Sequence, residues 1–75
     1  MILLCKNNIT EVYDDGENYR VKSKGEEDRL ISKKEQLQYP LACCLKWNMI
    51  PVDIDYLNKL SIRCEEEIKQ NKKKK

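Results

Sequence analysis

Residues 6–24 read KNNITEVYDDGENYRVKSK and contain two pairs that tolerate a positive φ angle, Asn7-Asn8 and Asp15-Gly16. Residues that favour β-strands flank each pair, and this pattern is typical of tight type I′ hairpins. Two such turns join three antiparallel strands into a β-meander, which we expect over about residues 2–6, 9–14 and 17–24.

The two turns also predict the register of the strands. Val12 is expected opposite Tyr19, and Glu11 opposite Arg20, where the two charged side chains would form a cross-strand pair. A slip of one residue would bury Arg20 and Lys22, so the alternation of apolar and charged residues specifies the pairing. The expected core face collects Leu3, Cys5, Thr10, Val12, Tyr19 and Val21, and the outer face collects Ile2, Leu4, Ile9, Glu11, Tyr13, Arg20 and Lys22.

Gly25 predicts a third turn. A type II′ pair at Gly25-Glu26 would place Val21 opposite Leu30 and add a short fourth strand at residues 28–31. Leu30 is the apolar residue that this strand would add to the core face.

The helical half of the chain begins after Ser32. Ser32 and Glu35 form the S-x-x-E pattern of a capping box, and apolar residues follow at helical spacing. Pro40 interferes, because it lacks a backbone N–H and its ring clashes with the carbonyl group four residues earlier. We expect a helical segment over about residues 33–48 that is kinked or broken at Pro40, with a short turn at 33–38 and the main helix after it.

A second helix is expected at about residues 54–70. Pro51 ends the preceding segment, and Asp53 is a suitable N-cap for the new helix. Ile54, Leu57 and Cys64 lie on one apolar stripe of this helix. The chain is therefore predicted to be a single α+β domain over residues 1–70, followed by a disordered lysine tail at residues 71–75.

The formal net charge of +2 does not describe the predicted domain. Four of the 15 basic residues are the terminal lysines 72–75, so 11 remain against 13 acidic residues, and the body of the chain carries −2. A folded nucleic-acid binder usually combines a basic face with a basic balance. The composition therefore favours a protein partner over nucleic acid.

The four cysteines are expected to be reduced, as in a cytoplasmic protein. Cys43 and Cys44 are adjacent and point apart, Cys5 and Cys64 are remote in sequence, and histidine is absent, so the spacing of a zinc site is missing. No secretory or membrane segment is expected, because no apolar run approaches the necessary length. We predict no metal and no cofactor. Whether any of the cysteines form a disulfide is not decided by the sequence.

The sequence carries no catalytic pattern, and we do not expect an enzyme. Without histidine, the Ser/His and Cys/His pairs of nucleophilic catalysis are impossible. The two glycines, Gly16 and Gly25, are too few and too far apart for a phosphate-binding loop.

Two surfaces are candidates for binding a partner. The first is the outer sheet face with Tyr13, Arg20 and Lys22, where an aromatic ring among cations and aliphatic residues suits a protein contact or a single nucleic-acid strand.

The second surface is one row of the first helix, formed by Tyr39, Cys43 and Trp47. Residues 41–45 are apolar on all sides of this helix, and a small domain can hardly bury both flanks. Tyr and Trp are common interface anchors, although the core is the favoured place for Trp47.

The leading hypothesis is a small non-enzymatic binding protein that occupies a site on a larger host protein or complex. Its wealth of Lys, Asn, Ile and Glu, with one alanine and three arginines, indicates coding in an AT-rich genome. Small chains of this kind are often phage or mobile-element accessory proteins. Many of them inhibit or redirect a host enzyme or a defence complex, and anti-CRISPR proteins are one such class.

The alternative is a nucleic-acid-binding regulator. It would use Arg20, Lys22 and Arg29 on the outer sheet face, with Lys72 and Lys73 of the tail as a nonspecific phosphate clamp. A homodimer through the helix or the sheet face is compatible with either hypothesis.

Overall fold

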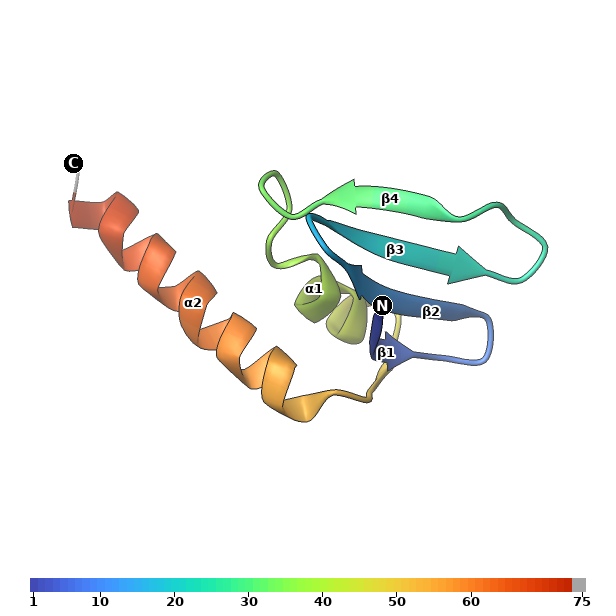
Figure 1. The fold of residues 1–75 in the computed structure, drawn as a ribbon. Helices are drawn as coiled ribbons and strands as arrows, with labels where there is room; N and C mark the ends of the chain where they lie inside the picture. Colours follow the sequence, from blue (N-terminus) through green and yellow to red (C-terminus); the bar gives the residue numbers. More distant parts are fainter. Residues whose placement is uncertain (74–75) are drawn as a thin grey trace.

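The structure of the chain is a computed structural model that describes residues 1–73, with side chains through residue 67. One antiparallel sheet carries two helices on one of its faces, as Figure 1 shows. The sheet order is β4-β3-β2-β1-β5. The elements are β1 (Ile2–Lys6), β2 (Thr10–Asp15), β3 (Asn18–Ser23), β4 (Arg29–Ser32), α1 (Tyr39–Lys46), β5 (Ile50–Pro51) and α2 (Ile54–Lys73). The predicted α+β class, with an N-terminal meander packed by two C-terminal helices, is confirmed.

The core lies between the sheet and the two helices. Both helices gather toward the end of the sheet where β3 begins, and α2 runs on past the sheet (Figure 1). Within the described residues, none of the helices combines the length and apolar character that crossing a membrane requires. The buried apolar cluster comprises Leu4, Cys5, Val12, Tyr19, Val21, Ile31, Cys43, Met49 and Leu57.

The β2–β3 turn differs from the predicted one. The turn residues are Gly16 and Glu17, since Asp15 pairs with Asn18, and Gly16 has the positive φ of +73° that the first position of a type II′ turn needs. The register is shifted by two residues, so Val12 pairs with Val21. Because side chains alternate with a period of two, this shift leaves the faces unchanged.

The core face of these two strands is therefore confirmed, and the predicted cross-strand charge pair is wrong. Val12, Tyr19 and Val21 are buried as expected. Glu11 lies opposite Lys22 rather than Arg20, because the pairing moved by two residues.

The loop between β1 and β2 is longer than the predicted two residues. Asn7 Oδ1 accepts hydrogen bonds from the backbone N–H groups of Ile9 (2.8 Å) and Thr10 (2.7 Å) and so stabilises the loop locally. The pairing is irregular between Leu3 and Cys5, and this bulge turns both Leu4 and Cys5 into the core. The prediction that Leu4 lies on the outer face is wrong for this reason.

Strand β4 is displaced by one residue from its predicted register. Its turn runs from Ser23 to Glu26, whose N–H donates to the Ser23 carbonyl at 3.2 Å, with Gly25 in the third position at φ +76°. Arg20, rather than Val21, therefore faces Leu30. A shift of one residue exchanges the faces, so Leu30 is 55% exposed, contrary to prediction, and the next residue, Ile31, is buried instead.

Pro40 breaks the helical segment rather than kinking it. Residues 33–38 form turns, and α1 begins at Tyr39 with Pro40 in its first turn, where the missing N–H costs no intrahelical bond. The helix ends at Lys46, before the predicted position 48, and Asn48 follows in the left-handed region at φ 51°. Strand β5, which pairs with β1, was not predicted.

Asp53 caps α2 as predicted, because its Oδ1 accepts a hydrogen bond from the Tyr56 N–H at 3.0 Å. The helix continues to Lys73, past the predicted end at about residue 70, so it includes residues 71–73 of the predicted tail. Residues 74 and 75 of that tail lie outside the described residues.

Candidate functional site, a groove at Trp47

A groove opens between the inner face of the sheet and the end of α1, and we call it the Trp47 groove. The helix α1 has eight residues, and its Tyr39 ring stacks on the Tyr19 ring at 6.4 Å between centroids. The groove lies beyond this contact, toward the β3–β4 loop, which is at the right of the view in Figure 1. The groove has a volume of about 310 Å³ and is lined by Ile9, Thr10, Val21, Ser23, Lys24, Glu26, Arg29, Tyr39, Cys43, Trp47 and Met49.

The groove has a buried floor and an exposed apolar mouth. Cys43 and Met49 are buried at its base. Trp47 is 57% exposed and Ile9 is 63% exposed, although both are large apolar residues that lose free energy in water. The Trp47 carbonyl accepts a hydrogen bond from Asn7 Nδ2 at 3.5 Å, which ties the end of α1 to the β1–β2 loop.

Charges of both signs surround the groove. Lys24 and Arg29 are basic and Glu26 is acidic, and all three are exposed on the β3–β4 loop or at the start of β4. Lys46 on α1 places its Nζ 5.5 Å from the centre of the Trp47 ring, a cation–π contact that holds one face of the indole.

Tyr39 and Cys43, in the groove, ionise less readily than the same groups do in water. Burial raises the pKa of Tyr39 to about 12, and it also raises the pKa of the Cys43 thiol. The pKa of Cys5 beneath is raised by burial and by the neighbouring thiols of Cys44 and Cys43. A thiol must be deprotonated to act as a nucleophile or metal ligand, so these cysteines serve packing.

Three predicted partner-binding residues, Tyr39, Cys43 and Trp47, come together in this groove. The expectation that Trp47 lies in the core is wrong. Trp47 is the C-cap of α1, so it lies just past the last helical residue and does not continue the row of Tyr39 and Cys43. Its indole is exposed. Sequence reasoning assigned Ile9 to the outer sheet face and missed Met49. Both residues lie in irregular segments that carry no periodic signal.

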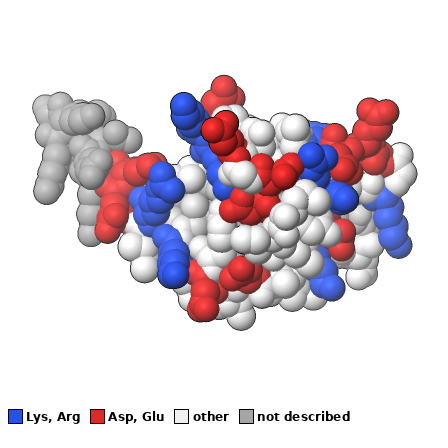
Figure 2. Space-filling view, viewed as in Figure 1, with Lys and Arg blue, Asp and Glu red and all other residues white. Residues whose placement is uncertain are grey.

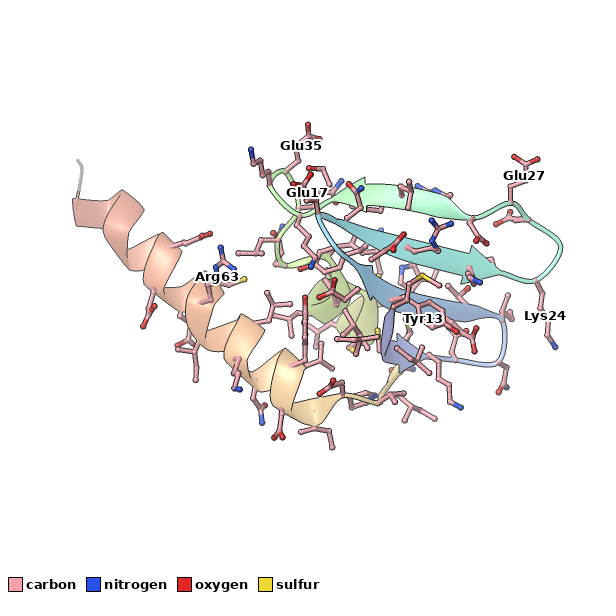
Figure 3. The ribbon with its side chains drawn as sticks, in the orientation of Figure 1. Tyr13, Glu17, Lys24, Glu27, Glu35 and Arg63 are labelled. Carbon is pink, nitrogen blue, oxygen red and sulfur yellow. The ribbon has the colours of Figure 1, made fainter. Side chains whose placement is uncertain are left out.

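The other predicted partner-binding residues lie together on the outer sheet face and are Tyr13, Arg20 and Lys22. Figure 3 shows Tyr13 near the middle of the sheet. Tyr13 is opposite Arg20, and Lys22 Nζ is 5.6 Å from the Tyr13 ring. The Tyr13 hydroxyl donates to Glu11 Oε1 at 2.9 Å.

The cations of the outer face have carboxylate partners. Arg20 contacts Asp15 at 2.8 Å and Asp28 at 3.2 Å, and Lys22 lies 4.0 Å from Asp28. Arg29 is not on this face, contrary to the alternative hypothesis, because it pairs with Val21 and shares the inner parity. The face is therefore less electropositive than its sequence indicates.

Lys72 and Lys73 complete the set of predicted nucleic-acid contacts. They belong to the last turn of α2, and their side chains lie outside the described part of the chain. Among the described residues, no three side chains of Cys, Asp or Glu converge in a way that could hold a metal ion.

Comparisons of the chain with protein-family models, with curated proteins and with solved structures found no match. The geometry of the surface therefore carries the functional argument.

Proposed function

We propose that this protein is a small non-enzymatic binding protein that receives an apolar side chain of a larger protein in the Trp47 groove. The observation that carries the proposal is the 57% exposure of Trp47 beside a buried floor. Tryptophan buries a large area at little conformational cost and is enriched among the residues that dominate binding free energy. An indole held at the mouth of an open groove is suited to that role.

The size and charge of the groove support a protein as the partner. A groove of about 310 Å³ accommodates one large side chain, and exposed Leu45 (86%) and Ile50 (64%) flank Trp47 in sequence. Standard interfaces take about 800 Å² from each partner, and the whole chain exposes 5907 Å². An interface centred on Trp47 would thus occupy a modest share of the surface, with Lys24, Glu26 and Arg29 as its polar rim.

The biological class that we propose is a phage or mobile-element accessory protein, which inhibits or redirects a host enzyme or a defence complex in the manner of anti-CRISPR proteins. The support is compositional, since the chain is rich in Lys, Asn, Ile and Glu and has no histidine. Four free cysteines suit a reducing compartment, and we therefore propose the host cytoplasm as its location.

The test is affinity capture of the tagged chain from lysate of a low-GC bacterial host, with and without nuclease, using three forms of the protein. The unmodified chain should retain one host protein at near-equal stoichiometry after nuclease. Trp47→Ala should lose that protein, and Leu30→Ala should keep it, because Leu30 is equally exposed but faces outward.

Three results would overturn the proposal. Retention of the same protein by Trp47→Ala would show that the groove is not the site. Recovery of proteins only in the absence of nuclease would favour a nucleic-acid regulator, and association of the chain with itself alone would favour a homodimer.

A further inference from the structure

A second groove lies at the other end of the molecule, between the 33–38 segment and α2. Two hollows share Lys33, Leu37 and Arg63, and they form one continuous surface that we call the basic groove. The larger part of its floor is apolar, with Leu37 half-buried and Leu60 buried, and this inner hollow has a volume of about 240 Å³. Its basic side chains are Lys33, Lys34, Lys59 and Arg63.

The four cations come from both walls of the groove. Lys33 and Lys34 belong to the 33–38 segment, and Lys59 and Arg63 belong to α2. Arg63 lies on the edge of α2 that faces the 33–38 segment (Figure 3). In Figure 2, basic atoms lie along α2 beside a pale surface that carries little charge.

The carboxylates near the groove do not balance these cations. Lys33 is paired with Asp14 at 2.7 Å, with side chains only 22% and 15% exposed. Among the side chains that the structure describes, Arg63 pairs only with Glu67, at 4.0 Å, and both of these side chains are more than half exposed. For Lys34 and Lys59, no ion pair occurs among the described side chains.

Two of the cations are also neighbours on α2. Lys59 and Arg63 are four residues apart, so two like charges lie on one helix face and repel each other. A bound anion would remove this repulsion and would satisfy both walls together.

We propose that the basic groove binds an acidic segment of a partner protein, in which an apolar side chain lies between carboxylates. The carboxylates would contact Lys34, Lys59 and Arg63, and the apolar side chain would lie on Leu37 and Leu60. This interaction is separate from the proposed function of the Trp47 groove and does not depend on it, since Arg63 and Lys24 lie at opposite ends of the molecule (Figure 3).

The lining of the groove fits a peptide better than a nucleic acid. Single strands bind by stacking their bases on exposed aromatic rings. Tyr56 is the aromatic residue that lines this groove, and it is half-buried with its hydroxyl close to Asp14, in contrast to the exposed indole of Trp47.

The test measures binding of a fluorescein-labelled peptide that repeats Glu-Glu-Leu to the full chain by fluorescence anisotropy. A peptide that repeats Gln-Gln-Leu, with the carboxylates removed, and a labelled oligothymidylate serve as comparison ligands. Amide chemical-shift mapping with the Glu-Glu-Leu peptide locates the binding surface.

The variant is Lys59→Glu with Arg63→Glu, and the matched control is Lys24→Glu with Lys46→Glu. All four positions are exposed, and both double variants change the net charge equally. Circular dichroism of both variants confirms that each is folded before binding is measured.

We expect the Glu-Glu-Leu peptide to shift the amides of residues 34–37 and 59–63 and to bind on the order of tenfold more weakly to the α2 variant, with little change for the control. The Gln-Gln-Leu peptide should bind weakly to all forms. Equal weakening by both variants, shifts confined to the Trp47 groove, or binding of oligothymidylate but not of the acidic peptide would overturn the proposal.

Discussion

The two ends of the sheet's inner face differ in what covers them. At the closed end, where β3 begins, Tyr19 is fully buried and its hydroxyl donates to the Leu37 carbonyl at 2.6 Å. At the open end, Val21 and Ser23 lie beneath the Trp47 groove. The closed end therefore contributes packing that stabilises the fold, and the open end leaves the apolar side chains of Trp47 and Ile9 exposed.

Polar contacts reinforce the closed end as well. The Asp14–Lys33 pair joins the end of β2 to the segment after β4, and Lys33 Nζ also lies 5.5 Å from the Tyr19 ring. At the open end, the polar link across the strands is the hydroxyl contact between Thr10 and Ser23 at 3.0 Å. Substitutions should accordingly affect folding at one end and binding at the other.

The largest effect on folding is expected for Tyr19→Ala. It removes a fully buried ring and leaves the Leu37 carbonyl without its donor. Truncating a large buried aromatic residue costs about 3–5 kcal/mol, which is close to the whole stability of a domain of this size. Urea denaturation should show a largely unfolded variant, and a cooperative transition close to that of the unmodified chain would contradict the role given to the closed end.

The register of the sheet shows how far sequence could predict this arrangement. The sequence indicates a turn at Gly16 but does not say whether Gly16 is its first or its second residue. The two choices differ by two residues in the pairing of β2 with β3. A shift of two leaves every face unchanged, so Val12, Tyr19 and Val21 are correctly placed in the core. At the Gly25 turn, the observed pairing of β3 with β4 differs from the predicted pairing by one residue. A shift of one exchanges the faces, so Leu30 is exposed and Ile31 is buried.

The candidate site could be predicted only in part, because several of its residues lie where the backbone is irregular and the sequence shows no periodic pattern. Tyr39 and Cys43 follow helical spacing and were found. Trp47 is the residue at which α1 ends, so spacing alone assigned it to the wrong environment. Leu4 entered the core through a bulge, and β5 has two residues, too few for an alternating pattern.

The second prediction concerns the pH dependence of the closed end. Burial alone would raise the pKa of Asp14, but hydrogen bonds from Lys33 and Tyr56 outweigh it and hold the pKa below its ordinary value of 3.8. Because the folded state binds this proton less tightly than the unfolded state, the pair stabilises the fold above about pH 4 and loses that contribution as the pH falls further.

Asp14→Asn tests this directly. We expect a loss of about 2 kcal/mol at neutral pH, the range for hydrogen bonds to charged groups, and a shallower loss of stability in acid than in the unmodified chain. The matched control is Asp15→Asn, since the Asp15–Arg20 pair is more exposed, with side chains 32% and 30% accessible, and should contribute less than the Asp14–Lys33 pair. Equal losses for the two variants in urea titrations would remove the distinction between the pairs.

The smallest effect on folding is expected for Trp47→Ala, at the open end. The indole of Trp47 is 57% exposed, so truncating it removes few buried contacts. Trp47 follows the last residue of α1, and the substitution leaves the backbone hydrogen bonds of the helix in place. Exposed substitutions away from special features usually change stability by about 0.5 kcal/mol or less. The urea midpoint should therefore stay close to that of the unmodified chain while partner capture is lost. If Trp47→Ala instead unfolds the protein as Tyr19→Ala does, the indole packs as part of the core in solution, and the open end cannot be assigned to binding on the strength of its exposure.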